Sequence, residues 1–311
     1  MNANLTIPRP YNALSAHLKE RYGCRVFKVS INAGFTCPNR DGAKGVDGCI
    51  YCESSALLPK GLPVGLDVSS QLSAGIRYVR ERHKADKFIA YFQINTNTYA
   101  PAPVLRGIYG PATAHPDVAA IAVSTRPDCL ETDAIDVLSE IKRKKDLWLE
   151  LGLQSASDAT LERLNRLHTV KDFEEAAKRA MSAGIDVCGH VIIGLPGEGR
   201  DSVLNTVRFL NRVNVWGVKF HQLQILKGTA LHALYEKGEV SPLALEEYAD
   251  LVVDSLELLR PGTIVHRLCG DSPARFLDAP RWGANKFMII ERIKKLMAER
   301  RTWQGKKFEA D

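Results

Sequence analysis

Strand-like and helix-like segments alternate along most of this 311-residue chain. Short runs rich in Val, Ile and Phe are followed by segments whose apolar residues recur at helical spacing. This alternation predicts an α/β fold of parallel strands joined by right-handed helical crossovers. The predicted strands span residues 26–31, 87–92, 117–124, 148–154, 185–193, 218–226 and, as a final strand, 263–268.

The helices predicted from the same spacing lie between and after these strands. Because no internal repeat and no break in composition marks a second domain, we expect one domain over residues 1–311. Its core would lie at about 24–230 and a C-terminal extension at about 240–311. The predicted helices span residues 70–83, 132–142, 158–167, 171–182, 201–213, 243–259 and 282–300.

The predicted strand at residues 148–154 has two different faces. Three leucines alternate in it with Glu150, Gly152 and Gln154, and alternate side chains of a strand point to opposite sides. The apolar face suits packing against helices, and the polar face suits the lumen of a barrel or a cleft. An edge strand with one solvent-exposed face is the alternative interpretation.

Polar or glycine-rich segments follow the predicted strands one after another. They are a loop with three cysteines, QINTNTYAP, STRPD, residues 154–155, GLPGEG and LKGT. In barrels and open parallel sheets, the carboxyl ends of the strands meet at one edge, where active sites are built. The sequence therefore predicts an active site at this edge.

The loop after the first strand contains Cys37, Cys49 and Cys52, with eleven residues between the first two and two between the last two. Thiolates gathered in one loop suit a soft metal centre. Four kinds of site compete: a structural zinc site, a CxxC redox pair, an iron–sulfur cluster with four Cys ligands, and a cluster with three Cys ligands and one open iron. We interpret the scattered remaining cysteines as core or loop thiols: Cys24, Cys129, Cys188 and Cys269.

The charge of the chain is concentrated near its end. The net charge is +6, and residues 281–311 hold nine Lys or Arg against four acidic residues. This segment either follows a phosphate backbone or forms a solvated helix face. An apolar run of about 20 residues, as a membrane span needs, is absent from the sequence. The start, MNANLTIPRPYNAL, lacks the regions of a signal peptide, so we expect a cytoplasmic protein.

Several segments together resemble the YhcC-like family of radical S-adenosylmethionine (SAM) proteins, which is related to the radical domain of the Elongator catalytic subunit. They are GFTCPNRDGAKGVDGCIYC, YFQINTNTYAP, WLELGLQSASDATLERLNR, HVIIGLPGE, LKGT and RLCGD. They extend from Gly34 to about Lys286. Two features depart from the usual patterns: the first cysteine gap is eleven rather than three, and Cys269 stands where a Thr is expected.

This resemblance implies the architecture and the cofactors. The fold would be a partial (β/α)6 TIM-type barrel of parallel strands with a C-terminal helical extension. Cys37, Cys49 and Cys52 would hold a [4Fe–4S] cluster, and SAM would chelate the open iron. One electron from a flavodoxin- or ferredoxin-type donor would cleave SAM to methionine and a 5′-deoxyadenosyl radical, with the protein supplying orientation and exclusion of water.

The resemblance also suggests which residues contact SAM. Two of these assignments have an alternative: the amide and hydroxyl side chains of residues 93–97 can cap a turn, and Arg126 can form a structural salt bridge instead of a fork to the SAM carboxylate. The strand end at Ile193, with the glycine-rich segment 194–199 after it, would approach the adenine. The remaining candidates are Tyr51 for the adenine, Gln93, Asn95, Thr96 and Asn97 for the amino group, and Glu150 and Gln154 for the ribose hydroxyls.

His190 and His221 are the candidate catalytic residues, for substrate binding or proton transfer. A lone histidine on a strand is more often a core residue with its hydrogen bonds satisfied than a catalyst. We regard Lys227 and Arg267 as weaker candidates of the same kind.

The resemblance suggests an enzyme that modifies tRNA, because Elongator-related radical domains act on wobble uridines and some closer members process the side chain of that base. Two alternatives remain open. One is radical modification of a protein or a small metabolite, and the other is a metal-binding or sensor protein without catalysis, which would hold zinc and unfold on chelation.

Overall fold

Seven parallel strands form a curled half-barrel in the computed structural model, which describes residues 9–57 and 67–310. Each strand pairs with the next in the spatial order β1-β2-β3-β4-β5-β6-β8. Residues 1–8, part of the stretch expected to lack a signal peptide, lie outside the described residues, as does Asp311 of the predicted extension. The strands are β1 (Val26–Ile31), β2 (Lys87–Phe92), β3 (Val118–Thr125), β4 (Asp146–Gln154), β5 (Asp186–Ile193), β6 (Gly217–Gln222) and β8 (Ile264–Arg267).

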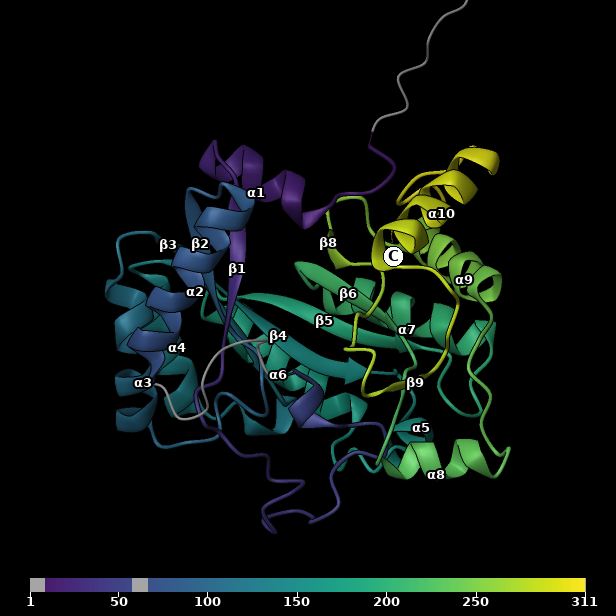
Figure 1. The fold of residues 1–311 in the computed structure, drawn as a ribbon, viewed down its shortest axis with the longest axis horizontal. Coiled ribbons are helices and arrows are strands. Elements are labelled where there is room, and N and C mark those ends of the chain that lie inside the picture. The colour runs from purple at the N-terminus through teal and green to yellow at the C-terminus, as the bar shows by residue number, and fades with distance from the viewer. Residues whose placement is uncertain (1–8, 58–66, 311) are drawn as a thin grey trace, which may run out of the picture.

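Helices connect the strands along the outer side of the sheet (Figure 1). Several begin at a side-chain cap, such as Asp67, which accepts a hydrogen bond from the Ser70 amide, and Thr169, which forms a capping box with Asp172. The helices of the described residues are α1 (Leu14–Tyr22), α2 (Val68–His83), α3 (Ala102–Ala114), α4 (Thr132–Lys142), α5 (Asp158–Arg163), α6 (Val170–Ser182), α7 (Arg200–Val213), α8 (Ala230–Glu236), α9 (Leu245–Leu258) and α10 (Lys286–Glu299).

Two predicted elements end several residues earlier in the structure than the sequence predicts. The strand expected at 218–226 is broken, because Ile225–Leu226 forms the separate strand β7, which pairs antiparallel with β9 (Leu277–Ala279). The helix expected at 158–167 ends at Arg163, since Asn165 and Leu167 adopt positive φ angles that a helix does not tolerate. The shortened helix lets the chain turn back toward the cysteine loop.

The core lies between the sheet and its helices. Leu149, Leu151 and Leu153 of β4 are fully buried in it, as the alternation predicts, and so is Leu147 at the start of the strand. A second apolar cluster fills the inner side of the barrel at the other end, where Trp148 and Tyr91 pack with α1. Burial at that end leaves the carboxyl end of the strands as the open end of the lumen.

Figure 1 shows α1 and α10 at one end of the molecule, and the cysteine-bearing loop with α5 and α8 at the other. The carboxyl ends of the strands point toward the cysteine loop. None of the helices in the described part of the chain is both long and apolar enough to cross a membrane.

Candidate active site

A cavity of about 470 Å³ lies at the carboxyl ends of the strands. Residues from separate strand ends line it, because parallel strands bring their carboxyl ends to one edge. Most of the predicted site residues are among them: Cys37, Cys49, Tyr51, Cys52, Gln93, Asn95, Thr96, Arg126, Glu150, Gln154, His190 and His221.

Asn97 and Ile193 are not among the residues that line this cavity. Asn97 Nδ2 donates to the carbonyls of Ile94 (3.1 Å) and Ser124 (2.9 Å), so its side chain fixes the turn, as the alternative interpretation held. The Ile193 side chain is fully buried in the core. Alternation along β5 explains this, because it sends His190 and Ile192 into the lumen and Ile193 outward.

A second cavity of about 210 Å³ adjoins the first, since Tyr51, Cys52 and Gln154 line both. Apolar side chains that the sequence analysis did not select form part of its wall: Ile192, Leu223 and Leu226. This space combines an apolar wall with a few polar groups, as small-molecule sites usually do.

The long gap between the first two cysteines folds into a compact loop. The Arg40 amide donates to the Cys37 carbonyl (2.8 Å), and the Gly48 amide donates to the Asn39 carbonyl (2.7 Å). Gly48 has a φ of +74°, and a Cβ there would lie 2.8 Å from Arg40 Nε. The loop therefore returns the chain to Cys49, and all three cysteines line the same cavity.

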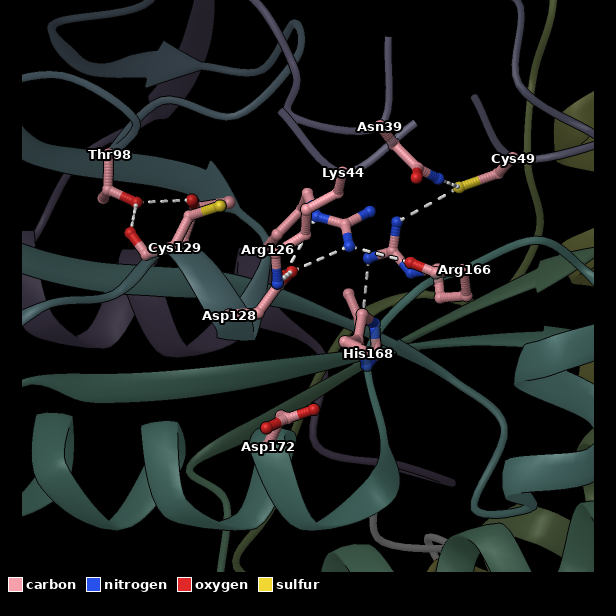
Figure 2. Close-up of polar contacts among 12 residues, drawn as sticks. Asn39, Lys44, Cys49, Thr98, Arg126, Asp128, Cys129, Arg166, His168 and Asp172 are labelled. Atoms are coloured by element: carbon pink, nitrogen blue, oxygen red, sulfur yellow. Dashed lines mark hydrogen bonds and ion pairs between the residues drawn. The ribbon is translucent and has the colours of Figure 1, made fainter. Parts of the chain in front are cut away.

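Arg166 lies beside Cys49 and links it to Arg126 (Figure 2). Its Nη1 donates to Cys49 Sγ (3.5 Å) and its Nη2 to the Gly152 carbonyl (2.9 Å), while Arg126 Nη2 donates to the Arg166 carbonyl (2.7 Å). Asn39 Nδ2 is a second donor to Cys49 Sγ, at 3.6 Å. The sulfur thus lies in a positively charged pocket.

The electrostatics of the cysteines suit an iron–sulfur cluster. Burial acts to raise the pKa of Cys49, but Arg166 and Arg126 outweigh it and lower the pKa, which favours the thiolate that a cluster needs. Burial and the neighbouring Cys49 raise the pKa of Cys52, so a bound metal would have to displace its proton. The described residues contain no group of three His, Cys, Asp or Glu arranged around a single metal ion.

Arg126 forms the structural salt bridge that was the alternative to SAM binding. Its Nε and Nη2 donate to Asp128 at 2.9 and 3.0 Å. Its Nη1 is buried and has no hydrogen-bond partner among the described residues. One donor group of Arg126 therefore remains for a ligand in the cavity that it lines.

Glu150 lies at the centre of a buried charge network, on the lumen face of β4. Its Oε1 accepts from Lys28 Nζ (2.7 Å), and its Oε2 accepts from Lys219 Nζ (2.6 Å) and Tyr91 OH (2.7 Å). Burial acts to raise the pKa of Glu150, but Lys219 and Lys28 hold it well below its usual range. The carboxylate is therefore engaged by protein groups, while its predicted contact with ribose stays a prediction.

The two candidate catalytic histidines face the same lumen. His190 Nε2 lies 3.0 Å from Glu150 Oε2, and the ring centroids of His190 and His221 are 5.6 Å apart. Burial, with Lys219 nearby, lowers the pKa of His190 to about 3, and burial with Arg267 lowers that of His221. Both rings are neutral at physiological pH, whereas burial lowers the pKa of Lys219 to about 7.

Arg166, Lys28 and Lys219 are residues of this site that the sequence analysis did not select. Arg166 was assigned to a helix that in fact ends before it. Lys28 and Lys219 occupy lumen-facing strand positions, and the signal that would have identified them is a charged residue inside an otherwise apolar strand.

Comparisons with known proteins agree with this geometry. Residues 31–210 match the Radical SAM superfamily, and residues 215–299 match the Radical_SAM C-terminal domain. YtqA of Bacillus subtilis is 39% identical over 299 residues, covering 96% of this chain and 93% of YtqA. YhcC of Escherichia coli K12 is 34% identical over 289 residues, covering 93% of this chain and 92% of YhcC.

Among solved structures, the archaeal Methanocaldococcus infernus Elp3 with an N-terminal deletion superimposes with a TM-score of 0.69 at 18% identity. The match covers 90% of this chain and 64% of that one, so this chain spans less than two thirds of it and the likeness shows the fold. The family's enzymes use a [4Fe–4S] cluster and SAM, which are therefore the cofactors here. The chain belongs to the radical SAM superfamily, with the YhcC-like proteins among its relatives.

Proposed function

We propose that this enzyme cleaves SAM reductively and uses the radical to modify tRNA, at the side chain of a wobble uridine. The observation that supports SAM cleavage is the shared cavity, which is lined by the three cysteines together with Tyr51, Gln93 and Arg126, whose Nη1 is free. The chemistry supplied by the bound cluster and SAM is the cleavage of SAM to methionine and a 5′-deoxyadenosyl radical.

The residues of the chain would hold these cofactors in fixed places. Cys37, Cys49 and Cys52 would be the cluster ligands, and Arg166 would stabilise negative charge on the Cys49 sulfur. The free Nη1 of Arg126 would donate to the SAM carboxylate. Tyr51 and the apolar wall of the adjoining cavity would exclude water from the adenosyl group.

The Elongator relationship supports tRNA as the substrate. Residues of the segments that carry the resemblance line the two adjoining cavities, and the match to the archaeal Elp3 fold covers 90% of this chain. A flavodoxin- or ferredoxin-type protein would deliver the electron. Because tRNA and such donors are found in the cytoplasm, we propose that the reaction takes place there.

The charges near the C-terminus favour a second candidate, which is radical modification of a protein or a small metabolite. Arg292 pairs with Glu246 (2.6 Å) and Arg300 pairs with Asp254 (2.8 Å), and Lys294 pairs with Glu291 (2.8 Å). Much of the basic charge expected to follow a phosphate backbone is therefore neutralised within the fold. A substrate without a phosphate backbone is consistent with this pairing.

Anaerobic reconstitution of the cluster, followed by dithionite and SAM, tests both parts of the proposal. The assay is run with and without tRNA from a strain that lacks the gene. We expect 5′-deoxyadenosine, together with a changed wobble nucleoside in the mass spectrum. An intact cluster without 5′-deoxyadenosine would contradict the radical reaction, and 5′-deoxyadenosine with unchanged nucleosides would contradict tRNA as the substrate.

A further inference from the structure

Arg267 and Lys286 form part of the cavity wall that the C-terminal part of the chain supplies. Arg267 is the last residue of β8, in register with Lys219 on β6, and Lys286 begins α10. Both side chains are half-buried and line the 470 Å³ cavity. They also line a separate cavity of about 370 Å³ bounded by α1, β1 and β8, so they stand between the two spaces.

The other buried cations of the cavity already have partners. Arg126 is paired with Asp128, and Lys219 with Glu150, while Arg166 donates to Cys49. Within residues 9–57 and 67–310, the side chains of Arg267 and Lys286 have no hydrogen-bond or ion-pair partner.

The two cations repel each other and are partly removed from water. Burial and the charge of Arg267 lower the pKa of Lys286, and Asp271, which lines the same cavity, offsets only part of this. Two half-buried cations without a bound anion are unfavourable, since desolvation disfavours the charged forms. An oxyanion bound between the two side chains would offset both their mutual repulsion and their desolvation. The planar Arg fork matches a carboxylate or a phosphate.

We propose that Arg267 and Lys286 together bind an oxyanion, a carboxylate or a phosphate, on the part of the substrate that enters the cavity. This inference rests on the proposed function, because it concerns the substrate of the same site. The proposal assigns different roles to two parts of the cavity wall. Residues from the 31–210 match provide the cysteines and Arg126, and residues from the 215–299 match provide Arg267 and Lys286.

The first test separates the substrate anion from the carboxylate of SAM itself. Arg267→Gln and Lys286→Gln are reconstituted and assayed with tRNA from the strain that lacks the gene. We expect the KM for tRNA to rise about tenfold or more, and the KM for SAM to change about twofold or less, since a charge-assisted contact to substrate is lost. A larger rise in the KM for SAM than for tRNA would overturn the proposal.

Two control variants check that the effect comes from the cavity. Arg143→Gln also removes a guanidinium group, but Arg143 follows α4 near the amino ends of the strands, away from the cavity, and its side chain is exposed. It should behave as wild type. Arg267→Lys keeps the charge and should retain more affinity than Arg267→Gln. Equal losses in these two position-267 variants would indicate a packing role and contradict anion binding.

The second test does not depend on tRNA and identifies the source of the anion. The reconstituted enzyme with SAM is titrated by calorimetry with 5-carboxymethyluridine, which carries only a carboxylate, and with uridine 5′-monophosphate, which carries only a phosphate. We expect one of them to bind, and Arg267→Gln to weaken that binding about tenfold or more.

The outcome of the titration is informative even if tRNA proves not to be the substrate. Binding of the carboxylate compound places the anion on the modified base, and binding of the monophosphate places it on the backbone. Binding of neither at millimolar concentration, or binding unchanged in Arg267→Gln, would refute the anion pair. If tRNA stays unmodified while one of the two compounds binds and Arg267→Gln weakens that binding, only the tRNA proposal is refuted.

Discussion

His266 shows what burial in the lumen does to a titratable group. Its side chain is fully buried, with Nδ1 3.6 Å from Glu150 Oε1, and its ring meets those of Trp148 and Trp216 edge-on. Burial lowers the pKa of His266 to about 4, with Lys28 adding to the effect, although Glu150 acts in the opposite direction. The ring is therefore neutral in the folded protein at pH 7.

We expect His266 to make stability fall as the pH falls. The unfolded chain takes up a proton near pH 6.5 and the folded chain only near pH 4, so the contribution is complete above about 6.5 and is lost toward 4. Between pH 7.5 and 5.5, the wild type should lose about 1.4 kcal/mol more unfolding free energy than His266→Leu. Urea denaturation at the two values measures this, and equal losses would contradict a neutral buried ring.

The cluster assignment is testable at single cysteines. Cys49→Ala should lose the brown absorbance and most of the bound iron after anaerobic reconstitution, because a thiolate beside Arg166 is removed. Cys269→Ala is the matched control, since Cys269 is fully buried in the core and does not line the cavity. Elemental analysis of both variants measures the iron, and retained iron in Cys49→Ala would remove that residue from the ligands.

The sequence was informative about site residues at strand ends and less so about loops. Alternation in β4 predicted the lumen position of Glu150, because pleating fixes which side chains share a face. Ile193 was selected for being at a strand end, although the same alternation turns it outward. Arg166 reaches Cys49 through positive φ angles at Asn165 and Leu167, which residue periodicity does not reveal.

At the scale of elements, the sequence predicted β1 and β2 with their observed bounds, because short buried strands stand out as apolar runs. α3 was not predicted, since its sequence contains Gly107, Gly110 and Pro111, which disfavour helix. Packing overrides these preferences: Tyr109 in the middle of α3 is fully buried and meets Phe92 edge-on, with ring centroids 4.8 Å apart.

Two helical glycines should respond in opposite ways to replacement by alanine. A Cβ at Gly75 in α2 would lie 2.3 Å from Val29 Cγ1 on β1, whereas a Cβ at Gly107 in α3 would meet nothing within 4 Å. Gly75→Ala should therefore cost about 1–3 kcal/mol through overpacking. Gly107→Ala should gain up to about 1 kcal/mol from helix propensity. Urea midpoints compare them, and equal midpoints would mean that α2 is not held tightly against β1.

At the scale of the whole molecule, segments from both ends of the chain close the half-barrel beside β8. The Val265 amide donates to the Asn12 carbonyl (2.8 Å), which places the chain before α1 against β8. Gln304 joins the C-terminal segment to the same place. Its Oε1 accepts from the Asn12 amide (2.8 Å), and its Nε2 donates to the carbonyls of Arg260 and Thr263, both at 2.8 Å. Strand alternation predicts the sheet but not this closure, which depends on contacts between residues far apart in sequence.

Gln304→Ala should open this closure without unfolding the barrel. It leaves the Asn12 amide and the Thr263 carbonyl without their buried partner, at an expected cost of about 1–3 kcal/mol. Hydrogen exchange should quicken first in α1 and β8, while β3 and β4 in the middle of the sheet keep their protection. Glu309→Gln, at an exposed position of the same segment, is the control and should exchange as wild type. Uniformly faster exchange in Gln304→Ala would mean that the closure and the sheet unfold as one unit. In that case the wall that carries Arg267 could not move independently of the cysteine side of the cavity.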